Sequence, residues 1–228
     1  SVPVARRLMQ RGLMPSAAVT FMLAAPVLNP VVIASTFVAF RGRTTLWTMV
    51  GGRFLLGMVV AISVGWVIGN RSKDELLKPN PEEAHEHLLE LGRPEARWRR
   101  FFVHLGNDFL FMGRFLLLGA TIAAAIQTFL PTSVLTGLAE RPVVSVLAMM
   151  GLAAALSLCS ESDAFVGASF VQFGPSAMLG FLVFGPMVDL KLAALYAGTF
   201  QRGFLRTVVI AVGATTLVAT LWIQVIWG

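Results

Sequence analysis

Long apolar runs divide the chain and predict membrane-spanning helices. The clearest is Leu46–Ile68, which is 23 residues long and contains a single charged residue, Arg53. A helix rises 1.5 Å per residue, so this run is long enough to cross a bilayer core of about 30 Å. Similar runs predict helices over Phe109–Leu130, Val143–Cys159 and Leu205–Trp227. The pattern therefore predicts an all-α, polytopic helical membrane protein.

Two further apolar segments are copies of one another. Residues 15–40 and 175–200 align without a gap at an offset of 160, and seven of the 26 aligned positions are identical. Each copy has a central proline, Pro26 or Pro186, which removes a backbone hydrogen bond from a helix. In transporters built from internal repeats, such paired interruptions mark the substrate site. Each copy crosses the bilayer once with a kink or folds as a re-entrant hairpin, and the sequence leaves both that choice and the copies' relative orientation open.

The composition agrees with a membrane protein. Hydrophobic residues make up 56% of the chain and charged residues 13%, and the mean hydropathy is +0.76. The net charge of +6 does not indicate nucleic-acid binding, because Lys and Arg gather at the edges of apolar runs and in residues 70–100. That loop is predicted to be cytoplasmic by the positive-inside rule. We expect a first repeat in 1–69, a charged loop in 70–100, and further helices with the second repeat in 101–228.

The charged loop contains a predicted short helix. Residues 80–83, Asn-Pro-Glu-Glu, have the N-cap, N1 proline and first-turn acids of a helix that would run to about Leu91. His85 and His87 lie among acidic residues, which raises the question of a metal site. Two residues that are two positions apart project to different sides of a helix, so we interpret them as part of a solvated face. We predict no metal and no cofactor.

The most polar stretch between apolar runs is 157–165. It contains a thiol, hydroxyls and two carboxylates, and its candidate site residues are Cys159, Ser160, Glu161 and Asp163. Acids at membrane depth are costly and normally face a cavity, pair with a cation or carry protons, so we predict a substrate-binding or ion-binding site here. The alternative is an interfacial loop in which Asp163 is the N-cap of a helix that begins near Ala164.

The two proline breaks supply a second set of candidates. Asn29 follows Pro26, and Asp189 follows Pro186 at the equivalent repeat position. Freed carbonyls and these side-chain oxygens are suited to a cation or a polar substrate group. Lys191 allows a buried pair with Asp189, whereas helix capping by Asp189 and snorkelling of Lys191 is an equally good explanation.

Two arginines within predicted spans, Arg53 and Arg114, are also costly at depth. Either would balance one of the acids. No helical spacing pairs them with an acid, so the sequence assigns them no partner.

Several segments resemble one known family. The run GLMPSAA at 12–18, followed by FMLAAPVLNP at 21–30, resembles the signature of the YraQ/ArsP-like predicted permeases, which include bacterial organoarsenical exporters. SESDAF at 160–165 and FLVFGPMVDLK at 181–191 are similar to the second half of that family. The resemblance covers nearly all of the chain outside 70–100. It implies a multi-pass permease of the bacterial inner membrane for a small solute and, in one branch, a small membrane-associated partner protein.

Thiols are implicated in arsenic handling by exporters of that family, and this chain has one cysteine, Cys159. Glu161 and Asp163 add hard oxygen ligands, which suit a proton or a hard cation better than soft trivalent arsenic. The chain begins at Ser1, and nothing before the first repeat corresponds to Val143–Cys159. We therefore expect a fragment that lacks at least one N-terminal helix.

We predict a permease that works by alternating access around the two proline breaks, with a proton or a cation as the coupling ion. The sequence does not specify the substrate or the direction of transport. The alternative is a membrane subunit that scaffolds a partner protein and does not itself transport. An enzyme is not expected, because the chain lacks G-x-G-D, H-E-x-x-H and a Ser or Cys with a neighbouring His.

Overall fold

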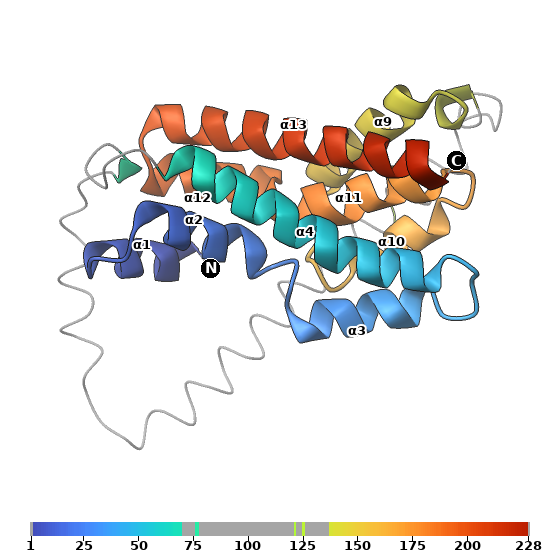
Figure 1. Cartoon of the computed structure of the whole chain (residues 1–228), viewed down its shortest axis with the longest axis horizontal. Helices are drawn as coiled ribbons and strands as arrows, with labels where there is room; N and C mark the ends of the chain where they lie inside the picture. Colours follow the sequence, from blue (N-terminus) through green and yellow to red (C-terminus); the bar gives the residue numbers. More distant parts are fainter. Residues whose placement is uncertain (1, 70–75, 78–120, 122–124, 126–136, 228) are drawn as a thin grey trace, which may run out of the picture.

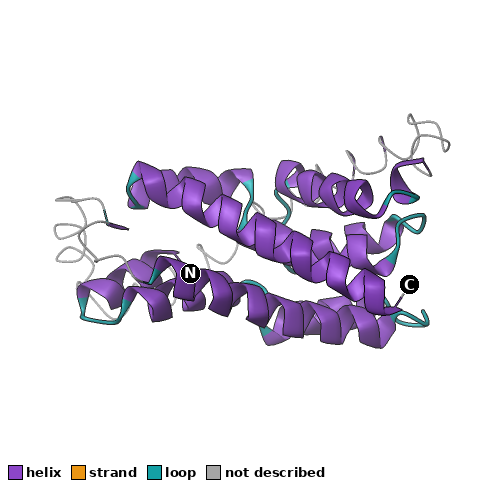
Figure 2. Ribbon diagram, turned by 45° about the horizontal axis from the view of Figure 1, so that its top comes forward, coloured by secondary structure: helices purple, strands orange, loops and turns teal. Residues whose placement is uncertain are grey.

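The computed structural model describes residues 2–69, 76–77, 121, 125 and 137–227, and this part of the chain is helical (Figures 1 and 2). The pairing of Leu77 with Phe200 is an isolated bridge. The predicted span Phe109–Leu130, the loop at 70–100 with its histidines, and Arg114 lie outside the described residues. The described helices are α1 (Val2–Gln10), α2 (Pro15–Ala24), α3 (Pro30–Ala39), α4 (Leu46–Ile68), α9 (Pro142–Leu156), α10 (Asp163–Ser169), α11 (Pro175–Met187), α12 (Leu190–Thr199) and α13 (Arg202–Trp227).

Helices α2 and α3 lie one after the other along α4 and run opposite to it (Figure 1). Ser16 of α2 lies against Gly69, just after the end of α4, and Thr20 lies against Gly65. Residue Val27, in the break between α2 and α3, faces Gly57. Farther along α3, Thr36 reaches Arg53. The first copy therefore follows α4 along most of its length as one broken segment, and it does not fold back as a hairpin.

Small residues on α4 allow this close packing. A Cβ atom added to Gly65 would overlap the Thr20 hydroxyl, and one added to Gly57 would press on the Val27 side chain. The bare backbone at these two positions lets α4 approach α2 and the break that follows it. Burial along this seam is close to complete, since Val19, Leu23 and Val64 are fully buried.

The second copy forms α11 and α12, which follow α13 in the same way. Phe184 of α11 faces Gly213 in the middle of α13, while Tyr196 of α12 packs against Phe204 near its beginning. Helix α11 continues through Pro186, which is buried within its last turn, and the break comes at Val188 and Asp189. This differs from the expectation that Pro186 itself interrupts the segment. A proline in the last turn removes a single helical hydrogen bond, so the helix persists for one more residue.

The predicted span over Val143–Cys159 is wrong. Helix α9 is 15 residues long and ends at Leu156, and at 1.5 Å per residue it covers about 22 Å, short of a bilayer core. Ser157 then adopts a left-handed conformation with φ of 46°, and the chain turns into α10. Helix α9 packs beside α11, where Gly185 faces Ala153. Residues 142–169 therefore form two short helices joined by a turn, each packed on α11, and we call residues 157–163 the hairpin tip.

Three helical segments in the described chain are long and apolar enough to cross a membrane: Leu46–Ile68, Pro175–Thr199 and Gly203–Val225. The first coincides with the predicted span, and the third begins two residues earlier than predicted. Helix α4 packs against both α11 and α13, and α10 packs against α3. This arrangement brings the hairpin tip to the first copy and, in the middle of the fold, gives α4 a buried side chain that is not apolar, Arg53.

Candidate functional site

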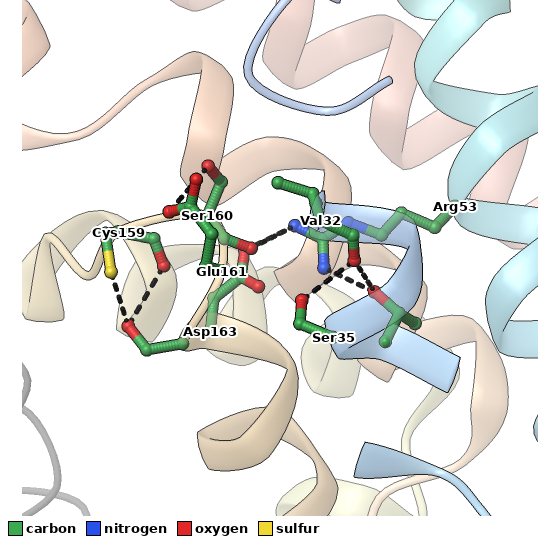
Figure 3. Close-up of polar contacts among 9 residues, drawn as sticks. Val32, Ser35, Arg53, Cys159, Ser160, Glu161 and Asp163 are labelled. Atoms are coloured by element: carbon green, nitrogen blue, oxygen red, sulfur yellow. Dashed lines mark hydrogen bonds and ion pairs between the residues drawn. The ribbon is translucent and has the colours of Figure 1, made fainter. Parts of the chain in front are cut away.

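Arg53 is fully buried, and its guanidinium group connects three separate elements (Figure 3). Nη1 donates to the Thr36 hydroxyl on α3 at 2.8 Å. Nη2 donates to Oδ2 of Asp163 at 2.8 Å and to the backbone carbonyl of Ser160 at 3.0 Å. Arg53 thus ties α4 and α3 to the hairpin tip. Since Arg53 and Asp163 are 110 positions apart, the fold, and not a helical spacing, forms this ion pair.

The tip is built so that Asp163 faces Arg53. Ser162 is the N-cap of α10 and Asp163 is its first helical residue, with a carboxylate that binds the guanidinium. The N-cap of this helix is therefore Ser162, one residue before the Asp163 of the sequence-based alternative. The backbone N–H groups of Ser162 and Asp163 both donate to the Cys159 carbonyl, which closes the turn. Asp163 is held at the start of a helix, where a negative charge is also favoured by the helix dipole.

The opposite end of the tip is bound to the second copy. The Ser157 hydroxyl accepts a hydrogen bond from the backbone N–H of Leu190, the first residue of α12, at 3.1 Å. The same hydroxyl donates to the Ala154 carbonyl at 3.0 Å. Ser157 therefore joins the end of α9 to the break between α11 and α12. The tip is therefore linked to one broken segment through Arg53, which bonds both Asp163 and Thr36, and to the other through Ser157.

The ion pair between Arg53 and Asp163 leaves two of its own polar atoms without a hydrogen bond in the described chain. Nε of Arg53 and Oδ1 of Asp163 are buried and have no hydrogen-bond partner in the described chain. Beside Asp163 is a small cavity of about 10 Å³, lined also by Ala153, Leu158, Phe181 and Gly185, which is close to the space that one water molecule needs. A buried charge with an unpaired oxygen is costly, so the carboxylate is suited to bind a proton or a water molecule there.

The remaining polar groups of the tip are half-buried. The Cys159 thiol lies 2.7 Å from the Ser162 hydroxyl, and the Ser160 hydroxyl donates to Glu161 at 3.5 Å. Figure 3 shows Cys159, Ser160 and Glu161 on the same turn as Asp163. The tip thus presents one soft ligand and one further carboxylate to a solute. Among the described residues, no group of three His, Cys, Asp or Glu side chains has the arrangement of a metal site.

The two helix breaks have matching caps. Asn29 is the N-cap of α3 and accepts a hydrogen bond from the Val31 N–H at 3.0 Å. Asp189 is the N-cap of α12 and accepts from the Leu192 N–H at 2.6 Å. Each side chain thus bonds to its own helix. Lys191 is exposed at the start of α12, and Asp189 caps that helix, as in the capping alternative. Pro26 is half-buried in the first break.

Sequence reasoning brought together Cys159, Ser160, Glu161 and Asp163, which do share one turn, but it assigned no role to Thr36 and no partner to Arg53. A signal for Arg53 was present, because it is the one charged residue in a 23-residue apolar helix and must find a counter-charge. Thr36 carried no such signal, since a threonine in an apolar helix usually bonds to its own backbone. Thr36 does this too, by donating to the Val32 carbonyl at 2.8 Å.

The long apolar helices and the polar tip between broken segments are features of a helical membrane protein. Residues 1–225 match the ArsP_1 family, which is described as "Predicted permease", and the chain belongs to this family of membrane permeases.

Two relatives match nearly the whole chain. The UPF0718 protein YcgR of Bacillus subtilis is 37% identical over 225 residues, which cover 98% of this chain and 75% of that protein. A Streptococcus mutans protein named "Putative two-component membrane permease complex subunit" is 32% identical over 228 residues, 99% of this chain and 73% of that protein. No solved structure matches the chain.

Proposed function

We propose that this chain is the transport subunit of a permease that moves a small solute across the bacterial inner membrane by alternating access. The buried contact of Arg53 with Asp163 is the observation that carries the proposal. The polar hairpin tip is linked to both broken segments, so a movement of one segment relative to the other changes the contacts of the tip. Membership of a permease family supports transport over enzymatic activity.

The orientation of the two copies supports an inverted repeat. Helices α2 and α3 run opposite to α4, α11 and α12 run opposite to α13, and α4 and α13 themselves run in opposite directions (Figure 1). The contacts between copies are reciprocal as well, because α1 packs on α12 and α10 packs on α3. Inverted repeats of this kind allow one half to rock against the other around a central site.

The proposed site consists of the tip and the two breaks. Glu161 and Asp163 bind the coupling proton or cation, while Cys159 and Ser160 contact the solute. The breaks at Pro26–Asn29 and Pro186–Asp189 supply backbone groups, and the exposed Lys191 lies just beyond the second break. When a proton or a cation neutralises the Asp163 carboxylate, its attraction to Arg53 is lost. The tip is then free to move with the solute.

A non-transporting subunit is the second candidate, and the name of the Streptococcus mutans relative favours it. In that case a small membrane-associated partner protein carries out a step that this chain only supports. The two candidates differ in one respect: a transport subunit needs the acids of its tip for flux, whereas a scaffold needs them only for folding.

Flux measurements in vesicles test the proposal. The full-length protein is reconstituted with and without the proposed membrane-associated partner protein. The native protein is compared with the Asp163→Asn, Glu161→Gln and Cys159→Ser variants across a panel of metals and organoarsenicals. We expect flux to be lost with Asp163→Asn and reduced with Glu161→Gln when flux is compared at equal amounts of folded protein. Loss with Cys159→Ser alone would assign a soft, thiol-binding substrate. Absence of flux from folded native protein under every condition would instead support the scaffold.

A further inference from the structure

An apolar groove lies between α4 and α13. It has a volume of about 530 Å³, and its walls include Leu55 and Val59 of α4 and Val218 of α13. Its floor is Leu179 of α11, which comes close to α4 because Gly52 has no side chain there. From Trp47 to Val59 the groove follows α4 for about 18 Å at 1.5 Å per residue.

Two tryptophans mark one end of the groove. Trp47 is 73% exposed and Trp222 is 68% exposed, and both line the groove near the beginning of α4 and the end of α13. Tryptophan side chains are enriched where a membrane core meets the headgroup region. This end therefore lies at headgroup level, and the rest of the groove extends toward the membrane core.

A polar cavity of about 280 Å³ continues from the same end, and we call it the hydroxyl chamber. It shares Thr48 and Ile223 with the apolar groove. The polar side chains that line it are Thr44, Thr45, Thr48, Ser145, Ser176 and Gln224. Ser176 is 7% exposed, and in the described chain its hydroxyl has no hydrogen-bond partner. Oε1 of Gln224 is also buried there without one. The Ser176 hydroxyl can donate a hydrogen bond to a ligand, whereas the Gln224 oxygen can only accept one, so the chamber suits a ligand that has both acceptor and donor groups.

The electrostatics of the hydroxyl chamber favour an anion. Helices α4, α9 and α11 all begin at its wall, and no side chain caps the first turn of any of them. Their free N–H groups and dipoles attract negative charge. The described lining contains no acidic side chain. Arg43 lines an adjoining cavity that shares Thr44 and Thr45 with the chamber, which adds a positive charge on that side.

We propose that the groove and the chamber together bind one anionic phospholipid, with its phosphate in the hydroxyl chamber and an acyl chain in the apolar groove. The continuity of a polar cavity with an apolar groove at headgroup level matches a lipid, which has both parts in this order. A free oxyanion would fill the chamber alone and leave the groove unoccupied. A second protein copy would cover the groove but would not satisfy Ser176.

Gly51 provides a sharp test, because it lines the groove and a Cβ atom there would meet open space. Gly51→Leu places a side chain in the groove, and its Cβ atom meets no neighbour. The matched control is Gly151→Leu on α9, where a Cβ atom also meets open space and which does not line the groove. A second variant, Ser176→Ala with Thr45→Val, removes two hydroxyls from the chamber and keeps the groove.

Native mass spectrometry of the full-length protein, purified in detergent and supplied with phosphatidylglycerol, counts the bound lipid. We expect one retained molecule per chain with native protein and Gly151→Leu, and its loss with Gly51→Leu. Diacylglycerol, which lacks the phosphate, should be retained less, and the Ser176→Ala, Thr45→Val variant should remove that difference.

Four outcomes would overturn the proposal. The first is that native protein retains no lipid, and the second is that Gly51→Leu and Gly151→Leu retain it equally. Displacement by inorganic phosphate with no effect of Gly51→Leu would assign the chamber to a free oxyanion. A change of oligomeric state with Gly51→Leu and unchanged lipid retention would assign the groove to a second copy.

Discussion

At the residue scale, the fold depends on one buried charge and its partners. Arg53 and Asp163 are both withdrawn from solvent and bind each other at 2.8 Å. The attraction within such a pair is offset by the cost of removing both charges from water, so the pair adds little net stability. Removing one partner is a different matter, because the other charge is left buried and unpaired.

Single and double substitutions of this pair should therefore be non-additive. We expect Arg53→Met and Asp163→Leu each to lower the free energy of unfolding by about 3–5 kcal/mol, and the double variant to recover most of that loss. Thermal unfolding in detergent, followed by tryptophan fluorescence, measures the three variants. Additive losses would show that the two side chains do not interact.

Ser157 is the corresponding contact on the second copy, and its role differs from that of Asp163. Its hydroxyl accepts from the Leu190 N–H at the start of α12. We expect Ser157→Ala to cost about 1 kcal/mol, typical of one lost hydrogen bond, and to leave the Arg53 contact intact. Hydrogen exchange at Leu190 should speed up in this variant. Unchanged exchange there would mean that the hydrogen bond is not formed.

At the element scale, the sequence predicted helices well where a run is both long and uncharged. Leu46–Ile68 was placed without error because its apolar run ends at polar residues on both sides. Val143–Cys159 was misjudged, since the apolar run hides the left-handed turn at Ser157. Neither the direction of the copies nor the pairing of Arg53 with Asp163 could be predicted, because both depend on contacts between residues far apart in the sequence.

The seam between α2 and α4 offers a test at this scale. A Cβ atom at Gly65 would overlap the Thr20 hydroxyl and lie 2.9 Å from the backbone carbonyl of Ser16. We expect Gly65→Ala to force the two helices apart at a cost of about 1–3 kcal/mol. Gly198→Ala on α12, where a Cβ atom meets open space, is the control and should be close to neutral. Equal stability of the two variants in a thermal melt would contradict the close packing of this seam.

At the scale of the whole molecule, two broken segments of opposite direction surround a hairpin tip that contacts both. Cys159 lies in this tip, is half-buried and is the one cysteine of the sequence. It is therefore a site-specific reporter of which side of the membrane reaches the tip. Under alternating access, the tip is open to one side at a time.

Labelling of Cys159 by a membrane-impermeant maleimide should depend on the side from which it is applied. We expect faster labelling from one face of sealed vesicles and a shift in the ratio of the two rates when a transported solute is added. Cys159→Ser supplies the background. Rates that are equal from both faces and insensitive to every solute would argue against a moving barrier.

The difference between the two copies has an energetic consequence. Arg53 occupies α4, but the residue 160 positions later, in the middle of α13, is Gly213, which faces Phe184. In the proposed alternating-access cycle, identical halves would make the inward-open and outward-open states symmetry-related and equal in free energy. The ion pair joins Arg53 of the first half to Asp163 of the second, and the reciprocal positions hold Gly213 and Pro3, which carry no charge. The two states of that cycle therefore differ in free energy, and a difference of about 1.4 kcal/mol already gives a tenfold preference for one side of the membrane.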